Sequence, residues 1–265
     1  MRIDGGVAKR NLRRGVEFAK DCEDVILKHR QQKPLGMLTY STLIAQRRLA
    51  AGIERLGFDK SYEGRILLRS MIEHYYNLSW VRLKNADRRA SRFVKFHALE
   101  RLKLLEALPE DMRPPDYDRV VAYFRKRRTA YRNLFRETNQ KTGVRYWVKS
   151  WATTPSFEGR VNEVQSVASA HADQILSFTY MLYRAFSGPT HGSAEHMMEI
   201  IRPTRLGFRP KDQPDRRPEA TIASAAVFLL GTLSHASQVL GFSRDMDERL
   251  ATLKGTAFTA FAIGI

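Results

Sequence analysis

The sequence predicts an all-α fold: a single multi-helix bundle with long antiparallel helices. Apolar residues recur at helical spacing through most of the 265 residues, whereas the alternating runs typical of strands are nearly absent. The gaps between the apolar stretches are short and contain proline or glycine, which is typical of connections between antiparallel neighbours. A hydrophobic content of 43% is sufficient for a substantial core.

Each predicted helix lies between two breaks in this periodicity. Residues that stop helices fall at Pro34-Leu35-Gly36, Gly57, Pro114-Pro115, Gly143, Pro155, Gly188-Pro189 and Arg202-Pro203. Between these breaks we expect helices over 6–31, 39–57, 60–84, 87–107, 117–139, 157–187, 192–200 and 218–240, with a short one near 243–253. The segment 207–218 contains three prolines and is expected to be a loop.

We expect one domain over residues 1–265. Its N-terminal helical hairpin, 1–58, has apolar faces that need a partner surface, and a core at 60–200 would supply one. Further C-terminal helices are expected within 218–265.

Composition argues against several classes of protein. A single cysteine excludes a disulfide framework and a cysteine-based zinc module. The start of the sequence lacks the apolar segment of a signal peptide, and no run of 18 apolar residues would cross a membrane. We therefore expect a cytoplasmic protein with no membrane partner. No cofactor or metal is expected, since no glycine-rich phosphate loop or known metal motif is present.

The chain is strongly basic, with 45 Lys and Arg against 28 Asp and Glu and a formal net charge of +17. Residues 82–103 contain eight basic and two acidic residues, 119–136 contain seven and none, and 202–218 contain six and two. Such clusters favour a polyanion as partner, although basic side chains also solvate ordinary helix surfaces. The candidate nucleic-acid-binding residues are Arg88, Arg89, Arg92, Arg125, Lys126, Arg127 and Arg128.

Aromatic residues interleave with these basic residues. Tyr123 and Phe124 could stack on bases, but the helical spacing of Val120, Phe124, Tyr131 and Phe135 favours core positions. Trp147 and Trp151 are expected in the core or at its rim, and His235, in an apolar helix, is expected to be a core histidine.

The helix predicted at 60–84 carries charge within an otherwise apolar surface. Arg65, Arg69, Glu73 and Asn77 recur every four residues and so form one stripe. A charge on a buried helix must be paired or line a cavity. The stripe is therefore either an internal or water-facing ion pair, or the wall of an active site in which Arg69 meets an anion and Glu73 orients it.

A second group of polar residues follows a predicted helix break at Gly188-Pro189. His191, Gly192 and Ser193 come directly after it, with Glu195 and His196 close behind. A broken helix leaves backbone groups without partners, which suits a functional site, but the same residues could simply form a turn. A metal held by Glu73, His191 and His196 is a further alternative.

Two arginine–histidine spacings resemble the R-x4–6-H signature of the HEPN ribonucleases and toxins. One joins Arg69 to His74, with Tyr76 following, and the other joins Arg184 to His191. The resemblance implies metal-independent RNA cleavage, in which His moves protons and Arg offsets charge at the scissile phosphate. On a continuous helix Arg69 and His74 lie about 140° apart, whereas a break allows Arg184 and His191 to converge.

Over roughly 60–200 the chain also resembles an uncharacterised all-helical bacterial family of unknown function. The resemblance rests on R-x3-E-x2-(Y/I)-N-L at 69–78, then Trp151, and finally Tyr183-x3-Ser187-x3-His191-Gly192-Ser193. It implies a polar centre of Arg69, Glu73, Ser187 and His191, with no established activity. His74, Arg184 and His196 are secondary candidates.

Three functional hypotheses follow. The first is a metal-independent, HEPN-like ribonuclease or toxin/defence effector, for which RNA is favoured over DNA and a homodimer and an antitoxin or defence-system protein are candidate partners. The second is a non-catalytic basic helical adaptor that binds nucleic acid or a protein. The third is a metal-dependent hydrolase.

Overall fold

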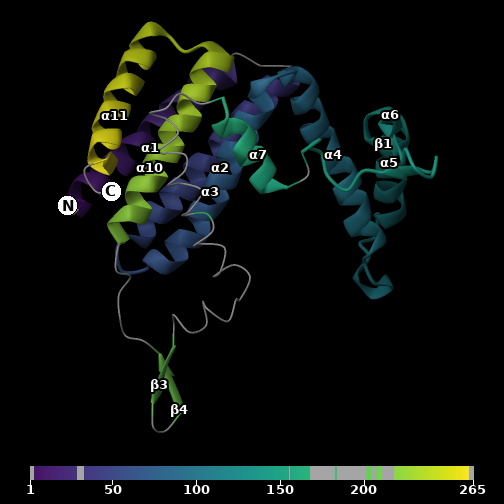
Figure 1. The fold of residues 1–265 in the computed structure, drawn as a ribbon, viewed down its shortest axis with the longest axis horizontal. Coiled ribbons are helices and arrows are strands. Elements are labelled where there is room, and N and C mark those ends of the chain that lie inside the picture. Colours follow the sequence, from purple (N-terminus) through teal and green to yellow (C-terminus); the bar gives the residue numbers. More distant parts are fainter. Residues whose placement is uncertain are drawn as a thin grey trace.

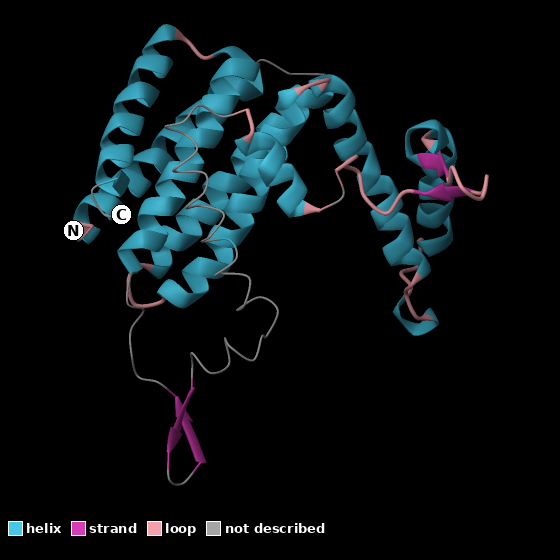
Figure 2. Cartoon of the chain, viewed as in Figure 1, coloured by secondary structure: helices cyan, strands magenta, loops and turns pink. Residues whose placement is uncertain are grey.

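The computed structural model describes residues 3–28, 33–154, 156–167, 183, 201–204, 207–210 and 218–262. Over these residues the protein is predominantly all-α, with two short β-hairpins (Figures 1 and 2), so the predicted fold class is confirmed.

The bundle is organised around α10 (Pro218–Ala236), a helix that is apolar around most of its circumference. It packs against α1 (Gly5–Lys28), α2 (Pro34–Leu56), α3 (Ser61–Leu83) and α11 (Arg244–Ala262). By length and composition the segment Pro218–Gly241 could cross a membrane, but 72% of its apolar window is buried inside the bundle. Burial among these helices accounts for its composition.

Several helix ends differ from the prediction. α2 begins at Pro34 rather than at residue 39, because proline is tolerated in the first turn of a helix, where its missing N–H would have no partner. α11 runs from Arg244 to Ala262 rather than stopping near residue 253. A short π-helix, Ser237–Gly241, follows α10.

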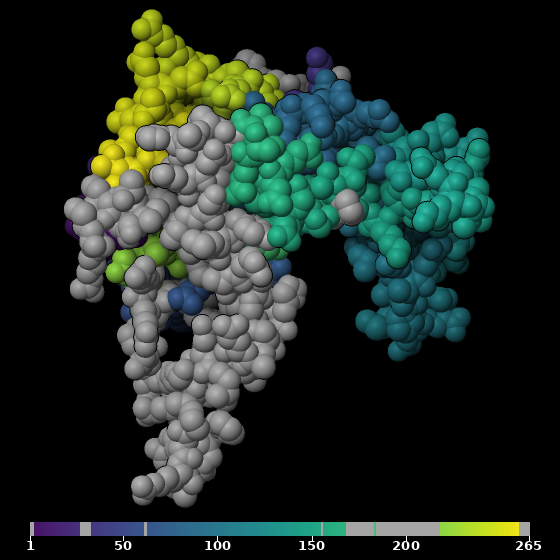
Figure 3. Space-filling view, viewed as in Figure 1, coloured from purple at the N-terminus to yellow at the C-terminus, as the bar shows by residue number. Residues whose placement is uncertain are grey.

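A protruding substructure, which we call the arm (residues 95–149), extends from the bundle (Figures 1 and 3). It consists of the C-terminal half of α4 (Ala86–Glu106), the 3-10 turn η1 (Glu110–Met112), α5 (Tyr117–Ala130), α6 (Arg132–Phe135) and a hairpin. Leu102, Leu105 and Val121 form a small hydrophobic cluster between α4 and α5, separate from the bundle core. The arm therefore has little buried interior and much surface.

The hairpin of the arm replaces the end of a predicted helix. The helix expected over 117–139 ends at Ala130, and after α6 the chain forms β1 (Arg136–Thr138), antiparallel to β2 (Arg145–Trp147). Gly143, at φ +68°, closes the turn in a conformation that favours glycine. Strands of three residues are too short to show an alternating pattern, so the sequence does not reveal them.

A second hairpin, β3 (Ile201–Thr204) with β4 (Gly207–Pro210), overlaps the start of the predicted loop. α7 (Phe157–Gln165) begins at the residue predicted for the helix 157–187, and Ser156 caps it by accepting a hydrogen bond from the Gly159 N–H. α7 ends at Gln165, where a turn follows at 166–167, so the predicted helix 157–187 is not continuous. Of its remainder, 168–182 and 184–187 lie outside the described residues, as does the helix predicted at 192–200.

Gly231 of α10 lies at a close contact with Tyr75 of α3. A Cβ at this position would lie 2.8 Å from Cε2 of Tyr75, whereas a Cβ at Gly255 in α11 would meet nothing within 4 Å. Overpacking costs about 1–3 kcal/mol and the better helix propensity of alanine returns about 1 kcal/mol. We expect Gly231→Ala to lower the free energy of unfolding in urea titrations and Gly255→Ala to leave it unchanged or raise it. Equal effects of the two variants would contradict this close contact.

Candidate functional site

The polar stripe predicted on α3 forms a cluster at the surface of the bundle. The Arg69 Nη2 and Glu73 Oε1 atoms lie 3.3 Å apart, and the two side chains are 14% and 38% exposed. They are neighbours because residues four apart lie one above the other on a helix.

Tyr183 joins this pair from a distant part of the sequence. Its hydroxyl donates a hydrogen bond of 2.9 Å to Oε1 of Glu73 and accepts one of 3.3 Å from Nη2 of Arg69. The Arg69 guanidinium also lies over the Tyr183 ring, 5.2 Å from its centroid. Burial raises the pKa of the Tyr183 phenol, so it is a neutral hydrogen-bond donor near pH 7.

Arg160, on α7, extends the cluster along α3. Its Nε donates to Oδ1 of Asn77 at 3.0 Å, and Nη1 donates to the Thr154 carbonyl at 3.2 Å. Burial lowers the pKa of this guanidinium, whereas attraction to Glu73 raises it. The ring of Phe157, also on α7, packs against the ring of Tyr183, with 4.4 Å between the two ring centroids. α3, α7 and Tyr183 thus form one polar cluster around Glu73.

The other predicted site residues are placed as follows. His74 lies about 140° around α3 from Arg69, and burial lowers the pKa of its imidazole while Glu73 raises it. Among the described residues its Nδ1 has no hydrogen-bond partner. Arg184, Ser187, His191 and His196 lie outside the described residues. Within the described part, no three His, Cys, Asp or Glu side chains gather as a metal site would require.

Glu163, three residues after Arg160, joins three helices. One carboxylate oxygen accepts from Arg89 Nη2 at 2.9 Å and lies 3.3 Å from Lys84 Nζ. The other accepts from Trp80 Nε1 at 2.5 Å and Thr154 Oγ1 at 3.2 Å. Burial by itself raises the pKa of Glu163, but the hydrogen bonds from Arg89 and Trp80 outweigh it and lower the pKa to about 2.

His235 lies in a half-buried cluster between α10 and α3. Its Nε2 lies 2.8 Å from Oγ of Ser79, the spacing of a histidine–serine catalytic pair. However, Arg82 contacts its Nδ1. Because arginine only donates, Nδ1 must accept and Nε2 carries the proton toward Ser79. In this tautomer His235 does not take a proton from Ser79, so we interpret it as structural, as the sequence predicts.

Two of the predicted nucleic-acid-binding residues are buried. Arg89 and Arg92 are only 9% and 8% exposed. Arg89 donates to the Trp80 carbonyl and to Glu163, and its guanidinium lies 3.6 Å from the Trp80 ring centroid. Arg92 donates to the carbonyls of Trp151 and Leu134, at 2.9 and 2.5 Å. Their N–H groups donate to acceptors inside the protein, so Arg89 and Arg92 are not candidates for phosphate contacts.

The remaining predicted cations face the surface. Arg88, Arg125, Lys126 and Arg127 are exposed, and Arg128 is half-buried. Arg125 pairs with Glu106 at 3.1 Å. From 119 to 149 the arm has ten Lys and Arg against one acid, Glu137, and all of these cations except Arg128 are exposed. The segment 119–149 of the arm is therefore a strongly basic surface.

Arg160 and Glu163 were not among the predicted site residues. Arg160 lies between Phe157 and Val164 on the apolar face of its helix, with Val161 beside it. A charged residue on such a face is the signal that could have identified it.

Residues 43–206 match the model of a family of unknown function (DUF5677), and because the match spans more than half of the chain, the chain belongs to that family. The predicted resemblance to an uncharacterised helical family is thereby confirmed. No curated protein and no solved structure matches the chain. The resemblance to HEPN ribonucleases is not confirmed and stays a prediction.

The Glu163 contacts predict a specific pH dependence of stability. Its pKa is about 2 in the folded protein, against an ordinary value of 4.5. The carboxylate therefore contributes stability that is fully present above about pH 4.5 and is lost as the pH falls through 2. We expect Glu163→Gln to lower the free energy of unfolding by about 2 kcal/mol at pH 7.

Urea titrations of wild type and Glu163→Gln at pH 7, 4 and 2.5 measure the difference in free energy of unfolding between the two proteins. This difference should become smaller as the pH falls. Glu158→Gln, on an exposed position of the same helix, is the control. A deficit that is equal at all three pH values would contradict the assignment.

Proposed function

We propose that this protein binds RNA through its basic arm. RNA binding is common to the ribonuclease hypothesis and to the nucleic-acid form of the adaptor hypothesis. The proposal rests on the charge of the segment 119–149, which has nine exposed Lys and Arg and one acidic residue. Each cation placed near a phosphate releases a condensed counterion, which makes such binding favourable and dependent on salt.

The distribution of charge within the protein supports this proposal. In the bundle, several arginines donate to internal acceptors, as Arg89, Arg92 and Arg160 do. In the arm, Lys126 and Arg132 are exposed and stand on two successive helices. A cation that is not needed for folding can be used to contact a phosphate.

Reversal of two charges on the arm tests the proposal. We expect Lys126→Glu with Arg132→Glu to weaken binding to single-stranded RNA at least ten-fold, and to reduce the slope of log Kd against log salt by about 1.4, since each lost phosphate contact contributes about 0.7. Fluorescence anisotropy over a salt series measures both quantities.

The matched control is Arg10→Glu with Lys20→Glu, which makes the same change in net charge at exposed positions of α1. Equal loss in both double variants would mean that only overall charge matters. Absence of salt-dependent RNA binding by the wild type would refute the proposal.

A second candidate function is metal-independent ribonuclease activity at the Arg69–Glu73 cluster. Tyr183 contacts both residues, and Ser187 and His191 follow it by four and eight positions in the sequence. In this mechanism the RNA 2′-oxygen bonds to the adjacent phosphorus as the bond from phosphorus to the 5′-oxygen breaks, which leaves a 2′,3′-cyclic phosphate and a free 5′-hydroxyl. His191 would take the proton from the 2′-hydroxyl and return one to the leaving 5′-oxygen, and Arg69 would offset the developing charge on the phosphate. Glu73 and Ser187 would position these groups.

Incubation with total RNA and tRNA, with and without EDTA, tests this candidate. We expect cleavage that resists EDTA and is lost in His191→Ala and Arg69→Lys, because lysine keeps the charge but not the guanidinium geometry that contacts Tyr183. Arg10→Lys, at an exposed position of α1 outside the arm, is the control and should cleave normally. Circular dichroism checks that each variant is folded.

Cleavage abolished by EDTA would favour the metal-dependent hydrolase instead. If the wild type binds RNA but does not cleave it, the result contradicts the ribonuclease hypothesis and supports the hypothesis of a non-catalytic adaptor.

A further inference from the structure

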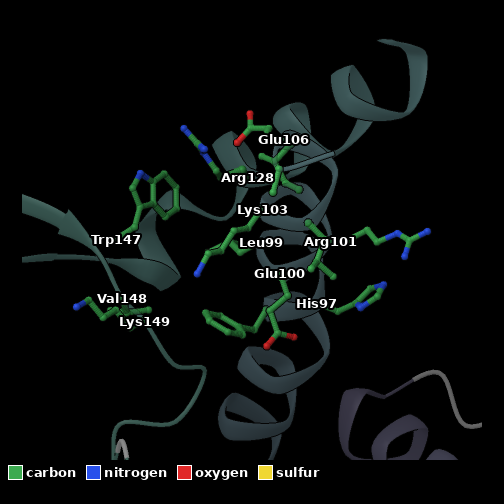
Figure 4. Close-up of a pocket in the computed structure, with 14 residues that line it drawn as sticks. His97, Leu99, Glu100, Arg101, Lys103, Glu106, Arg128, Trp147, Val148 and Lys149 are labelled. Atoms are coloured by element: carbon green, nitrogen blue, oxygen red, sulfur yellow. The ribbon is translucent and has the colours of Figure 1, made fainter. Parts of the chain in front are cut away.

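A groove runs along the arm between α4 and the strand β2. It has a volume of about 990 Å³, at the upper end of the range of small-molecule sites. Figure 4 shows Leu99 and Lys103 of α4 facing Trp147 and Val148 across it, whereas His97 and Arg101 point away. The groove thus combines an aromatic and aliphatic lining with cations.

Arg128, on α5, lies at one end of the groove beside Trp147 (Figure 4). Its guanidinium carbon is 5.2 Å from the centroid of the Trp147 ring. A tryptophan beside an arginine is the combination on which nucleobases stack in proteins that bind single strands.

An arginine beside a tyrosine occurs at a second, smaller pocket between α4 and α5, of about 230 Å³. There Arg127, the neighbour of Arg128, lies 4.6 Å from the ring centroid of Tyr123 and donates to the Tyr131 hydroxyl at 3.1 Å. Tyr123 is 50% exposed. Consecutive residues of α5 therefore hold two arginine–aromatic pairs, each lining its own pocket.

We infer that the groove holds unpaired bases of single-stranded RNA, with one base stacked on Trp147 and the flanking phosphates near Arg128, Lys103 and Lys149. This inference rests on the proposed RNA binding by the arm and names the form of RNA that it takes. A base can lie against a side-chain ring only when it is unstacked, as in single strands, loops and bulges. An A-form duplex presents its phosphates and sugars instead.

The groove suits RNA better than an acidic protein segment. Glu100 and Glu106 are among its lining residues, and they repel phosphate and carboxylate alike, so charge does not distinguish RNA from an acidic protein segment here. Arg125 pairs with Glu106 and offsets its charge. The repetition of arginine–aromatic pairs favours stacked bases, which need one such platform each.

Trp147→Leu and Trp147→Tyr separate stacking from space filling. Leucine keeps an apolar side chain in the groove but has no ring, whereas tyrosine keeps a ring. We expect Trp147→Leu to bind a twelve-nucleotide single-stranded RNA about ten-fold more weakly and Trp147→Tyr to stay within about three-fold of wild type. Neither variant should change the affinity for the corresponding duplex.

Tyr146→Leu is the matched control. Tyr146 is the neighbouring aromatic residue of β2, is 45% exposed, and is not among the residues that line the groove. Because successive side chains of a strand point to opposite faces, this variant should bind the single strand as wild type does.

Different failures have different meanings. Wild type that binds single strand and duplex equally, or a Trp147→Leu that binds both as wild type does, would overturn the groove inference and leave RNA binding by the arm intact. Wild type that binds neither RNA would overturn both. Competition for the single strand by polyglutamate that is lost in Trp147→Leu would assign the groove to an acidic protein segment instead.

Discussion

The arrangement of α3, α4 and α7 depends on the hydrogen bonds that the Glu163 carboxylate accepts. The carboxylate accepts from Trp80 of α3 and Arg89 of α4, so one side chain of α7 ties three helices together. Arg160, three positions earlier on the same helix, bonds Asn77 of α3. Residues three apart lie on one side of a helix, so Arg160 and Glu163 both face α3. Through Glu163, α7 fixes the orientation of α4 relative to the bundle, and through Arg160 it contacts the polar cluster around Glu73.

Two sets of arginines in the protein differ in their surroundings. Several arginines of the bundle are partly or wholly buried, and burial lowers the pKa of Arg82, Arg92 and Arg160. They replace the hydrogen bonds that buried carbonyls and carboxylates would otherwise lose. Those of the arm lie over a small core and face outward. Part of the basic charge is therefore used inside the bundle, whereas the segment 119–149 of the arm presents nine exposed Lys and Arg.

The periodicity of the sequence is sufficient for most of the fold. Long helices such as α3 and α10 follow the predicted limits closely, because each carries several turns of consistent apolar spacing. The departures occur where a signal is short or ambiguous. Pro34 starts a helix rather than separating two, and the strands of the arm have three residues each. Predicted residues from 184 to 200 lie outside the described part of the chain.

The sequence by itself determined the fold class, the family, the Arg69–Glu73 pair and the regions of basic charge, because these depend on spacing along one helix or on composition. Only the tertiary structure decided that Tyr183 and Arg160 join that pair, that Arg89 and Arg92 are internal, and that Trp147 lines a groove. The physical reason is that burial and partners depend on helices brought together across more than 70 residues of sequence, as Arg89 and Glu163 are. No local pattern records such distant contacts.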